Sequence, residues 1–214
     1  APEIILEACT LAQKEKEKIV KEFSEWANSG LKVLALVYKQ NGNVRELKDF
    51  EWVGLVGIED PVRPSVKNAV DLCHKAGIKV KIVTGDYRGT AQKVAAAIGL
   101  PVKQDQIIEG KELETMTDSD LAKVIDDVVL FCRVAPHQKL KIVNALQRHG
   151  EVVAMIGDGV NDAPALKKAN IGVSVGNATD VAKETASLIL LDSDFKTLVS
   201  AVQEGRIIFD NIKK

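Results

Sequence analysis

Short apolar runs alternate with stretches of helical periodicity along most of this chain. The runs predict strands at residues 34–38, 52–58, 79–83, 128–132, 152–156, 171–175 and 187–191. The periodic stretches predict helices at residues 2–9, 11–29, 65–76, 90–98, 119–126, 138–148, 163–169 and 179–185, and from about residue 195 to the C-terminus. For residues 101–118, the pattern predicts a polar loop or a short element of secondary structure. Strands that are continuously apolar, separated by helices, are typical of a parallel sheet covered on both faces.

The N-terminal part follows a different pattern from the rest of the chain. Two predicted helices come first, and two predicted strands then follow each other directly, joined by a turn signal at Asn41-Gly42. Regular alternation of strand and helix begins only after this pair. The change in composition near residues 57–61 therefore marks the expected domain boundary.

Composition narrows the class of protein. With 214 residues, 46% apolar content and a net charge of −1, the chain is expected to form one or two domains, and nothing in its totals points to nucleic acid. No apolar run approaches the roughly 20 residues that a membrane helix needs, and no signal peptide is visible. The cysteines and histidines show no metal-ligand spacing: Cys9, Cys73, Cys132, His74, His137 and His149. We expect a soluble intracellular chain with buried free thiols.

The most informative segment runs from Met155 to Leu166. A predicted buried strand ends there in a turn flanked by Gly157 and Gly159, which carries Asp158, Asn161 and Asp162. Oxygen ligands at the end of a buried strand suit Mg²⁺, and ligands of open α/β sheets lie at that edge. The alternative is a turn that only caps the following helix, but this turn carries more polar groups than such a cap needs. We therefore expect phosphate to be handled with Mg²⁺.

Two further segments combine polar groups with a helix start. Thr84-Gly85-Asp86 follows a predicted strand and precedes a helix, so it could hold a phosphate oxygen or simply cap the helix. Lys139 lies in a first helical turn, where the helix dipole disfavours a cation. That conflict indicates a task such as neutralising a phosphoryl group, although an exposed lysine remains the alternative, as it is for Lys141.

A third segment invites a competing interpretation. Asp192-Ser193-Asp194 follows an apolar strand, and Thr197 comes soon afterwards. This order resembles the strand-Asp-x-Asp-x-Thr signature of phosphatases that use an aspartate nucleophile. The alternative is a strand-end turn with an aspartate helix cap, which chain order favours, because a nucleophile would precede the Thr and Lys segments.

Several segments together resemble the P-type cation-transporting ATPases, most closely the calcium-pump or sodium/potassium-pump branch. In the order of that family, the matching segments are Ala1-Pro2-Glu3, Asp60-Pro61 with Pro64, Thr84-Gly85-Asp86, Phe131 to Lys139, Gly157 to Pro164, and Val202 to Asn211. The Gly-Asp-Gly-x-Asn-Asp-x-Pro motif is present without a departure, and the resemblance covers essentially the whole chain.

The resemblance implies an α/β fold: a haloacid-dehalogenase-like Rossmannoid parallel sheet with helices on both faces, plus a partial α+β nucleotide-binding domain. It implies that residues 1–57 end the nucleotide-binding domain, that 58–200 form the phosphorylation domain without its first strand, and that 201–214 begin a stalk helix. The implied setting is the cytoplasmic face of a membrane. The implied partners are ATP and the remainder of the pump: an upstream phosphorylation strand, an actuator domain and membrane helices.

The resemblance also implies roles for individual residues, with Mg²⁺ and ATP as cofactors. Thr84 would hold a phosphoryl oxygen, and Lys139 would neutralise that group. Asp158 would bind Mg²⁺, and Asn161 and Asp162 would support the phosphoryl group and the metal. The residues expected to contact the nucleotide are Gly85, Asp86, Arg133 and Lys32, the last where the family usually has arginine.

One departure from the family pattern affects the expected activity. The family nucleophile lies in an Asp-Lys-Thr-Gly-Thr segment, which this sequence lacks. We expect that aspartate upstream of Ala1, on a strand central to the sheet, between the strands that end at Thr84 and Ile156. The isolated chain is then expected to be inactive. Two other functions stay open: a phosphatase using Asp192, and a non-catalytic module that binds Mg²⁺ or nucleotide.

Overall fold

The computed structural model describes residues 2–40, 46–59, 61–192 and 194–213. The chain folds into two compact units. Unit 1 comprises Ala1–Pro61 with Asp86–Val94, and unit 2 comprises Val62–Gly85 with Ala95–Lys214. The predicted turn at Asn41-Gly42 lies outside the described residues, as do Ala1, Asp60 and Ser193 of the segments quoted above.

Unit 1 contains two helices and two strands at the places where the sequence pattern predicts them, and it also includes residues Asp86–Val94, which the family resemblance assigns to the following domain. Its elements are α1 (Pro2–Glu7), α2 (Gln13–Asn28), β1 (Lys32–Tyr38), β2 (Glu51–Ile58) and the first part of α4 (Arg88–Ala97). Strands β1 and β2 pair antiparallel. Phe23 of α2 and Val33 of β1 are buried together, and the Tyr87 ring meets Phe23 edge-on at 4.8 Å between centroids.

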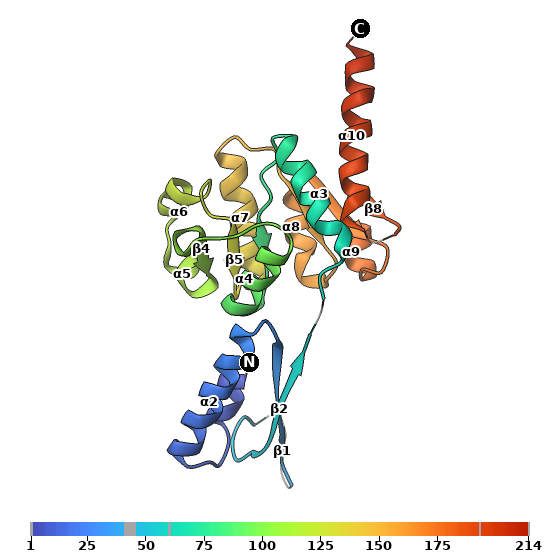
Figure 1. Ribbon diagram of the computed structural model, residues 1–214. Coiled ribbons are helices and arrows are strands. Elements are labelled where there is room, and N and C mark those ends of the chain that lie inside the picture. The colour runs from blue at the N-terminus through green and yellow to red at the C-terminus, as the bar shows by residue number, and fades with distance from the viewer. Residues whose placement is uncertain (1, 41–45, 60, 193, 214) are drawn as a thin grey trace. The chain divides into compact units, whose positions relative to one another are not determined.

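Among its described residues, unit 2 contains six strands, which form two separate parallel sheets (Figure 1). One sheet has the order β3-β5-β4 and the other the order β6-β7-β8. The strands are β3 (Ile82–Val83), β4 (Ile107–Glu109), β5 (Leu130–Cys132), β6 (Ala154–Gly157), β7 (Ile171–Val175) and β8 (Leu188–Leu190). Because all the pairings are parallel, the carboxyl ends within each sheet share one edge.

Helices connect these strands and cover them. They are α3 (Pro64–Lys75), the end of α4, α5 (Gly110–Thr115), α6 (Asp118–Val124), α7 (Pro136–Arg148), α8 (Ala163–Lys168), α9 (Asp180–Thr185) and α10 (Phe195–Ile212), with short 3₁₀ turns η1 (Gln104–Gln106) and η2 (Val160–Asp162). The expected haloacid-dehalogenase-like α/β fold is confirmed, since parallel sheets are flanked by helices.

The two sheets leave a gap between β3 and β6, where the family resemblance implies a missing strand, but the expectation that each strand is buried on both faces is wrong in detail. Among the described residues, β3 and β6 each pair on one side only, and β6 is half-buried rather than buried. Val152, predicted to begin that strand, lies before it and is 79% exposed. Strand β8 is also largely exposed, because it forms the outer edge of its sheet.

Two other differences have local causes. The predicted strand 79–83 shrinks to Ile82–Val83, because its neighbour β5 begins only at Leu130 and offers no ladder to residues 79–81. The predicted polar region 101–118 contains β4 and α5. Strand β4 is a three-residue strand, too short for its alternation to stand out from the surrounding polar residues.

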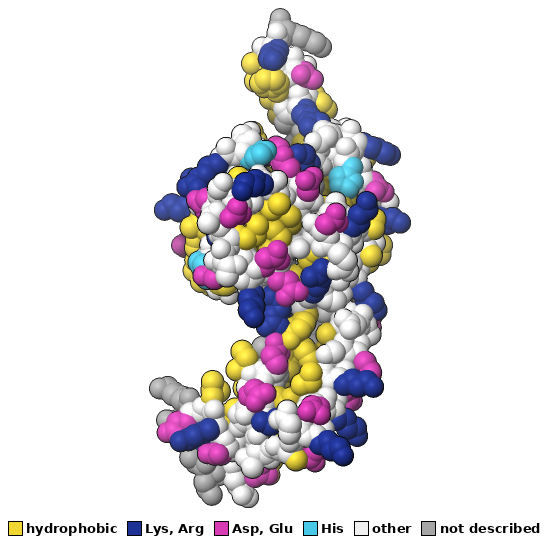
Figure 2. Space-filling view, turned by 90° about the vertical axis from the view of Figure 1, so that its left-hand side faces the viewer, with side chains coloured by type: hydrophobic (Ala, Val, Ile, Leu, Met, Phe, Trp, Pro, Cys, Tyr) yellow, Lys and Arg dark blue, Asp and Glu magenta, His cyan; other side chains and the backbone are white. Residues whose placement is uncertain are grey.

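The main core of unit 2 lies between the first sheet and helices α5 to α7. It includes Leu113, Leu121, Ile125 and Phe131, all with 0% exposure. The three cysteines are buried and free, as expected. The outer part of α10 projects beyond the sheets, where Figure 2 shows hydrophobic side chains exposed. Within the described ranges, no helix combines the length and apolarity required to cross a membrane.

Replacing Leu121 with alanine tests this core. Leu121→Ala removes a fully buried side chain and should reduce the free energy of unfolding of unit 2 by about 2–5 kcal/mol. Val152→Ala, at a position 79% exposed, is the control and should stay within about 0.5 kcal/mol of the parent. Urea unfolding followed by circular dichroism measures both. Equal effects at the two positions would contradict the assigned core.

Candidate functional site

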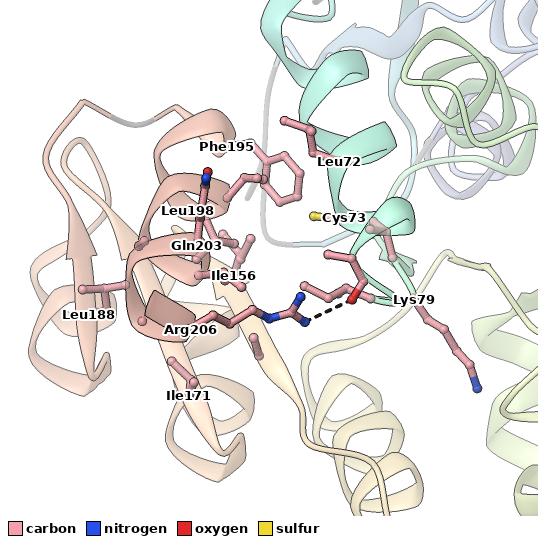
Figure 3. A pocket seen from close by; sticks show the side chains of 18 of the residues that line it. Leu72, Cys73, Lys79, Ile156, Ile171, Leu188, Phe195, Leu198, Gln203 and Arg206 are labelled. Atoms are coloured by element: carbon pink, nitrogen blue, oxygen red, sulfur yellow. Dashed lines mark hydrogen bonds between the residues drawn. The ribbon is translucent and has the colours of Figure 1, made fainter. Parts of the chain in front are cut away.

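A groove lies between the two sheets of unit 2 and is also lined by helices α3 and α10 (Figure 3). Its volume is about 1080 Å³. Strands β3 and β6 contribute Val83, Ala154 and Ile156, and Val80 lies just before β3. Helices α3 and α10 add mainly apolar side chains such as Leu72, Cys73, Phe195 and Leu198. The Arg206 guanidinium donates a hydrogen bond to the Ala76 carbonyl at 3.0 Å, which joins α10 to the end of α3. An apolar groove between two open parallel edges has the form of a missing strand position.

Thr84 follows β3 directly, next to Val83, which lines that groove. Its N–H donates to the Phe131 carbonyl at 2.9 Å, and its own carbonyl accepts from the Val134 N–H at 3.0 Å. Both backbone groups of Thr84 are thus fixed by β5 and the residues after it. Gly85 follows and is exposed; a Cβ there would meet only the Val134 carbonyl at 3.9 Å, so packing does not require glycine.

An ion pair links the carboxyl ends of the two sheets. The Lys139 Nζ of α7 lies 2.6 Å from Asp162 Oδ1, and the two side chains are only 15% and 9% exposed. The other Asp162 oxygen accepts from the Gly159 N–H at 3.2 Å. The structure thus brings together two predicted site residues and shows why the lysine tolerates a first helical turn, since a carboxylate faces it.

Gly157 is required by this arrangement. A Cβ on Gly157 would lie 2.5 Å from the Asp162 Cβ, so only glycine leaves room for the aspartate to turn back over the end of β6. The sequence pattern alone suggests a different task for this glycine, the close approach of backbone to a ligand. The structure gives it a definite steric task, which is to place Asp162 beside Lys139.

Asp158 and Asn161 are exposed at the same end of β6. The Asp158 carbonyl accepts from the Thr179 N–H at 2.9 Å and from its hydroxyl at 3.3 Å, which anchors the backbone and leaves the carboxylate exposed at the loop. In the described part of the chain, no cluster of three His, Cys, Asp or Glu side chains forms a metal cage. Mg²⁺ commonly binds through one or two carboxylates and keeps several waters, so a site with Asp158 and Asp162 fits its chemistry.

The residues expected to contact nucleotide fall in both units. In unit 1, Lys32 Nζ lies 3.9 Å from Asp86 Oδ1, and both side chains are substantially exposed. In unit 2, Arg133 has a φ of 54°, one of two positive values outside glycine among the described residues. A backbone conformation that costs energy at a candidate functional residue is a feature of many active sites.

Asp192 occupies a different place from these residues. It follows β8, the far edge strand, so β7 separates it from the β6 end of the groove. Its carboxylate accepts from the Asp194 N–H at 3.1 Å and from the Thr197 hydroxyl at 2.5 Å. Asp194 accepts from the Lys196 N–H and caps α10. The geometry is that of a strand-end turn followed by a helix cap.

Three polar side chains have roles that the sequence did not reveal. Lys141, interpreted as an exposed lysine, donates to the Leu113 and Met116 carbonyls and caps the end of α5. Lys81 similarly donates to carbonyls of residues 125, 126 and 128, and burial lowers its pKa. Gln138 is buried beside Gly110. A glutamine three residues after a possible N-cap was the available signal for Gln138; Gly110 gave none.

Comparison with known proteins shows extensive similarity. The family of haloacid dehalogenase-like hydrolases matches residues 2–170. A calcium-transporting ATPase of Bacillus subtilis is 46% identical over 195 residues, covering 88% of this chain and 22% of that protein. The human calcium-transporting ATPase type 2C member 1 is 43% identical over 205 residues, covering 95% and 22%. A Lactococcus lactis calcium-transporting ATPase is also 43% identical, covering 93% and 23%. The chain spans about a fifth of the length of these relatives.

A double-mutant cycle tests the ion pair that joins the sheets. Asp162→Asn leaves a mostly buried ammonium without its counter-charge and should destabilise unit 2 by about 3 kcal/mol. Lys139→Met combined with Asp162→Asn removes both charges and should recover most of that loss, and Lys139→Met alone completes the cycle. Urea unfolding of the parent, both single variants and the double variant gives the coupling energy. A coupling near zero would mean that the pair does not hold the two carboxyl ends together.

The turn at Asp192 has a predictable pH dependence. Hydrogen bonds from the Thr197 hydroxyl and then the Asp194 N–H hold the pKa of Asp192 below its ordinary value of 3.8. A lowered folded pKa means that the stabilisation is present above pH 3.8 and is lost as pH falls through the folded value. Asp192→Asn should therefore be less stable than the parent at pH 7, and the difference should shrink below pH 3.8. Thermal melts at both pH values measure this. A difference independent of pH would contradict the assigned bonds.

Proposed function

Since this chain belongs to the haloacid dehalogenase-like hydrolase family, we propose that it is the cytosolic catalytic part of an ATP-driven cation pump. The pump would form and hydrolyse an aspartyl phosphate with Mg²⁺. The nucleophilic aspartate would be upstream of this chain. Relatives that are named as calcium-transporting ATPases support calcium as the transported ion. Residues 1–57 would belong to the nucleotide-binding domain, 58–200 to the phosphorylation domain and 201–214 to a stalk helix.

The groove between β3 and β6 is the single observation that carries this proposal. A parallel strand in that position would hydrogen-bond to both open edges and bring its carboxyl end to Thr84, Lys139 and Asp158. Strand order reverses across the groove, because the chain builds β3-β5-β4 on one side and β6-β7-β8 on the other. Ligands of open α/β sheets lie at the carboxyl end of such a switch point.

Each side chain at that edge has a defined chemical task in the proposal. The Thr84 hydroxyl, on a backbone fixed by β5, would donate to a phosphoryl oxygen. Lys139 would neutralise charge on that group, the main requirement of phosphoryl transfer. Asp162 would orient the ammonium through the 2.6 Å contact. Asp158 and Asp162 would hold Mg²⁺, which supplies further positive charge when bound. Asn161 would donate to a phosphoryl oxygen.

Nucleotide contacts complete the proposed site. Arg133, Gly85, Asp86 and Lys32 would contact the nucleotide, as the family resemblance implies. In place of the family's usual arginine, Lys32 keeps the positive charge and gives up two-pronged recognition. Replacing Lys32 should therefore reduce the salt dependence of nucleotide binding more than replacing Gly85.

The phosphatase alternative fits the geometry less well. Strand β7 stands between the strand before Asp192 and the groove, and the Asp192 carboxylate stabilises the turn into α10. No observation favours it over the pump. A non-catalytic module that binds Mg²⁺ or nucleotide remains compatible with the isolated chain, and the following experiment separates it from the pump proposal.

Two preparations test the proposal. The first is the isolated chain, and the second is a chimera in which this chain replaces the matching segment of the Bacillus subtilis relative. With labelled ATP and Mg²⁺, the chimera should gain an acid-stable, hydroxylamine-sensitive label on an upstream aspartate, and the isolated chain should gain none. Lys139→Met in the chimera should reduce labelling at least about 100-fold, as the loss of a charge-stabilising group does. Lys167→Met, an exposed lysine of α8, is the matched control and should label normally.

Labelling of the isolated chain would show that the nucleophile lies within these residues and would restore Asp192 as a candidate. A folded chimera that binds nucleotide but never gains label would leave only the binding module.

A further inference from the structure

The ladder between β3 and β5 contains one extra residue at the site. In a regular parallel pair, one residue hydrogen-bonds to the two residues that flank its partner, which are two positions apart. Thr84 instead bonds to Phe131 and Val134, which are three positions apart. The register is regular just before this point, with Ile82 opposite Leu130 and Val83 opposite Phe131. The strand therefore forms a β-bulge opposite Thr84.

Arg133 is in this bulge and adopts a strained backbone conformation. Its φ of 54° lies in the left-handed region, which residues with a Cβ rarely adopt. Such a conformation costs free energy and persists only where surrounding contacts enforce it. The contacts around the bulge should therefore identify the residues that keep it in place.

Gly110 makes the first of these contacts. It is buried at the start of α5, and a Cβ there would lie 2.1 Å from the Arg133 carbonyl oxygen and 2.9 Å from its carbonyl carbon. Real side chains do not approach backbone this closely, and backbone cannot give way as a flexible side chain does. Only glycine therefore allows the Arg133 carbonyl to turn toward α5.

Gln138 makes the second contact and is only 3% exposed. Its Oε1 accepts from the Ala135 N–H at 2.9 Å, and its Nε2 donates to the Gly110 carbonyl at 2.8 Å and to Glu114 Oε2 at 2.5 Å. The Gln138 side chain therefore connects Ala135, just after the bulge, to Gly110, which packs against the bulge. Bonds from His137, and then Gln138, hold the pKa of Glu114 below its usual value and keep it an acceptor.

We propose that Gly110 and Gln138 are positioning residues that hold the bulge at Arg133 and thereby align Thr84 with Lys139. Ala135 is the N-cap of α7, and Lys139 directly follows Gln138. One residue more or fewer before a helix turns its side chains by about 100°, since a turn takes 3.6 residues. The bulge therefore decides whether Lys139 faces Asp162. The inference rests on the proposed function only for the chemical step that this alignment serves.

A simple helix cap does not account for these contacts. A capping interaction explains why Gln138 accepts from Ala135, because a glutamine three residues after the N-cap often does so. It does not explain the bond to the Gly110 carbonyl, the space that a Cβ on Gly110 would fill, or the positive φ of Arg133. These three observations all concern the same bulge.

The chimera described above provides the kinetic test. Gln138→Leu should lower the rate constant for phosphoenzyme formation at least about 10-fold, because small displacements of reacting groups have large effects on rate. The ATP concentration at half-saturation should rise as well, because the bulge also holds Arg133, a proposed nucleotide contact. Gln147→Leu is the matched control: it is also a glutamine of α7, with an Nε2 that donates to the Lys168 carbonyl at 2.9 Å, but it lies far from the bulge. Its rate constant should be unchanged.

Amide hydrogen exchange of the isolated chain tests whether Gln138 holds the bulge, and it requires no enzymatic activity. Gln138→Leu should accelerate exchange at Thr84, Val134 and Ala135, and Gln147→Leu should not. If Gln138→Leu leaves both exchange and the rate constant at parental values, the inference is overturned. Faster exchange with an unchanged rate constant also overturns it, because Gln138 would then be only structural. If the parental chimera forms no phosphoenzyme, the proposed function fails. In that case, unaltered exchange in Gln138→Leu would still contradict the positioning role of Gln138.

Discussion

The contact between Lys139 and Asp162 holds the candidate site together. It joins a helix that follows the first sheet to the loop that ends β6 in the second, with 2.6 Å between nitrogen and oxygen. Within the described residues the two sheets pair no strands with each other, so the usual source of alignment between neighbouring strands is lacking. A mostly buried ion pair with further hydrogen bonds is sensitive to geometry, because either charge alone is costly to bury. It therefore fixes where the two carboxyl ends meet.

The same arrangement explains why the groove and the polar residues belong together. The groove lies between the free edges of β3 and β6, and its walls are mainly apolar. Polar groups gather where these strands end: Thr84 on one side, Asp158 and Asp162 on the other. A strand entering the groove would satisfy two open edges and deliver its last residue to those groups. Packing and chemistry thus point to the same occupant in the proposed pump.

The sequence predicted most elements, because their patterns are local. Strand β7 was placed without error, and α2, α7 and α10 to within a few residues, since each has a strong periodicity or a clear end signal. Strand β4 was missed, because three residues carry too little pattern. The gap in the sheet was expected from the family resemblance alone. Nothing local in residues 79–83 or 152–156 indicates that one edge of each strand is open.

Part of the candidate site could likewise be predicted from the sequence, and part of it could not. Lys139 stood out because the dipole at a helix start disfavours a lysine. Asp162 stood out because its turn carries more polar groups than a helix cap needs. That they contact each other could not be predicted, because residues 140–161 separate them in the chain and only the fold joins them. Gly110 and Gln138 act through the backbone of Arg133. A glycine in a polar stretch carries no signal of such a role, and a glutamine three residues after a possible N-cap signals only the cap.

The central claim is that the ends of β3 and β6 surround one position for Mg²⁺ and a phosphoryl group. Titration of the isotope-labelled chain with Mn²⁺ in place of Mg²⁺ tests it most directly, because the paramagnetic ion broadens the NMR signals of nearby amides. The account predicts early, saturable broadening at Asp158, Asn161 and Gly159 and, at the same ion concentration, at Thr84 and Gly85. Broadening confined to the β6 loop, or spread over the acidic surface without saturation, would contradict it.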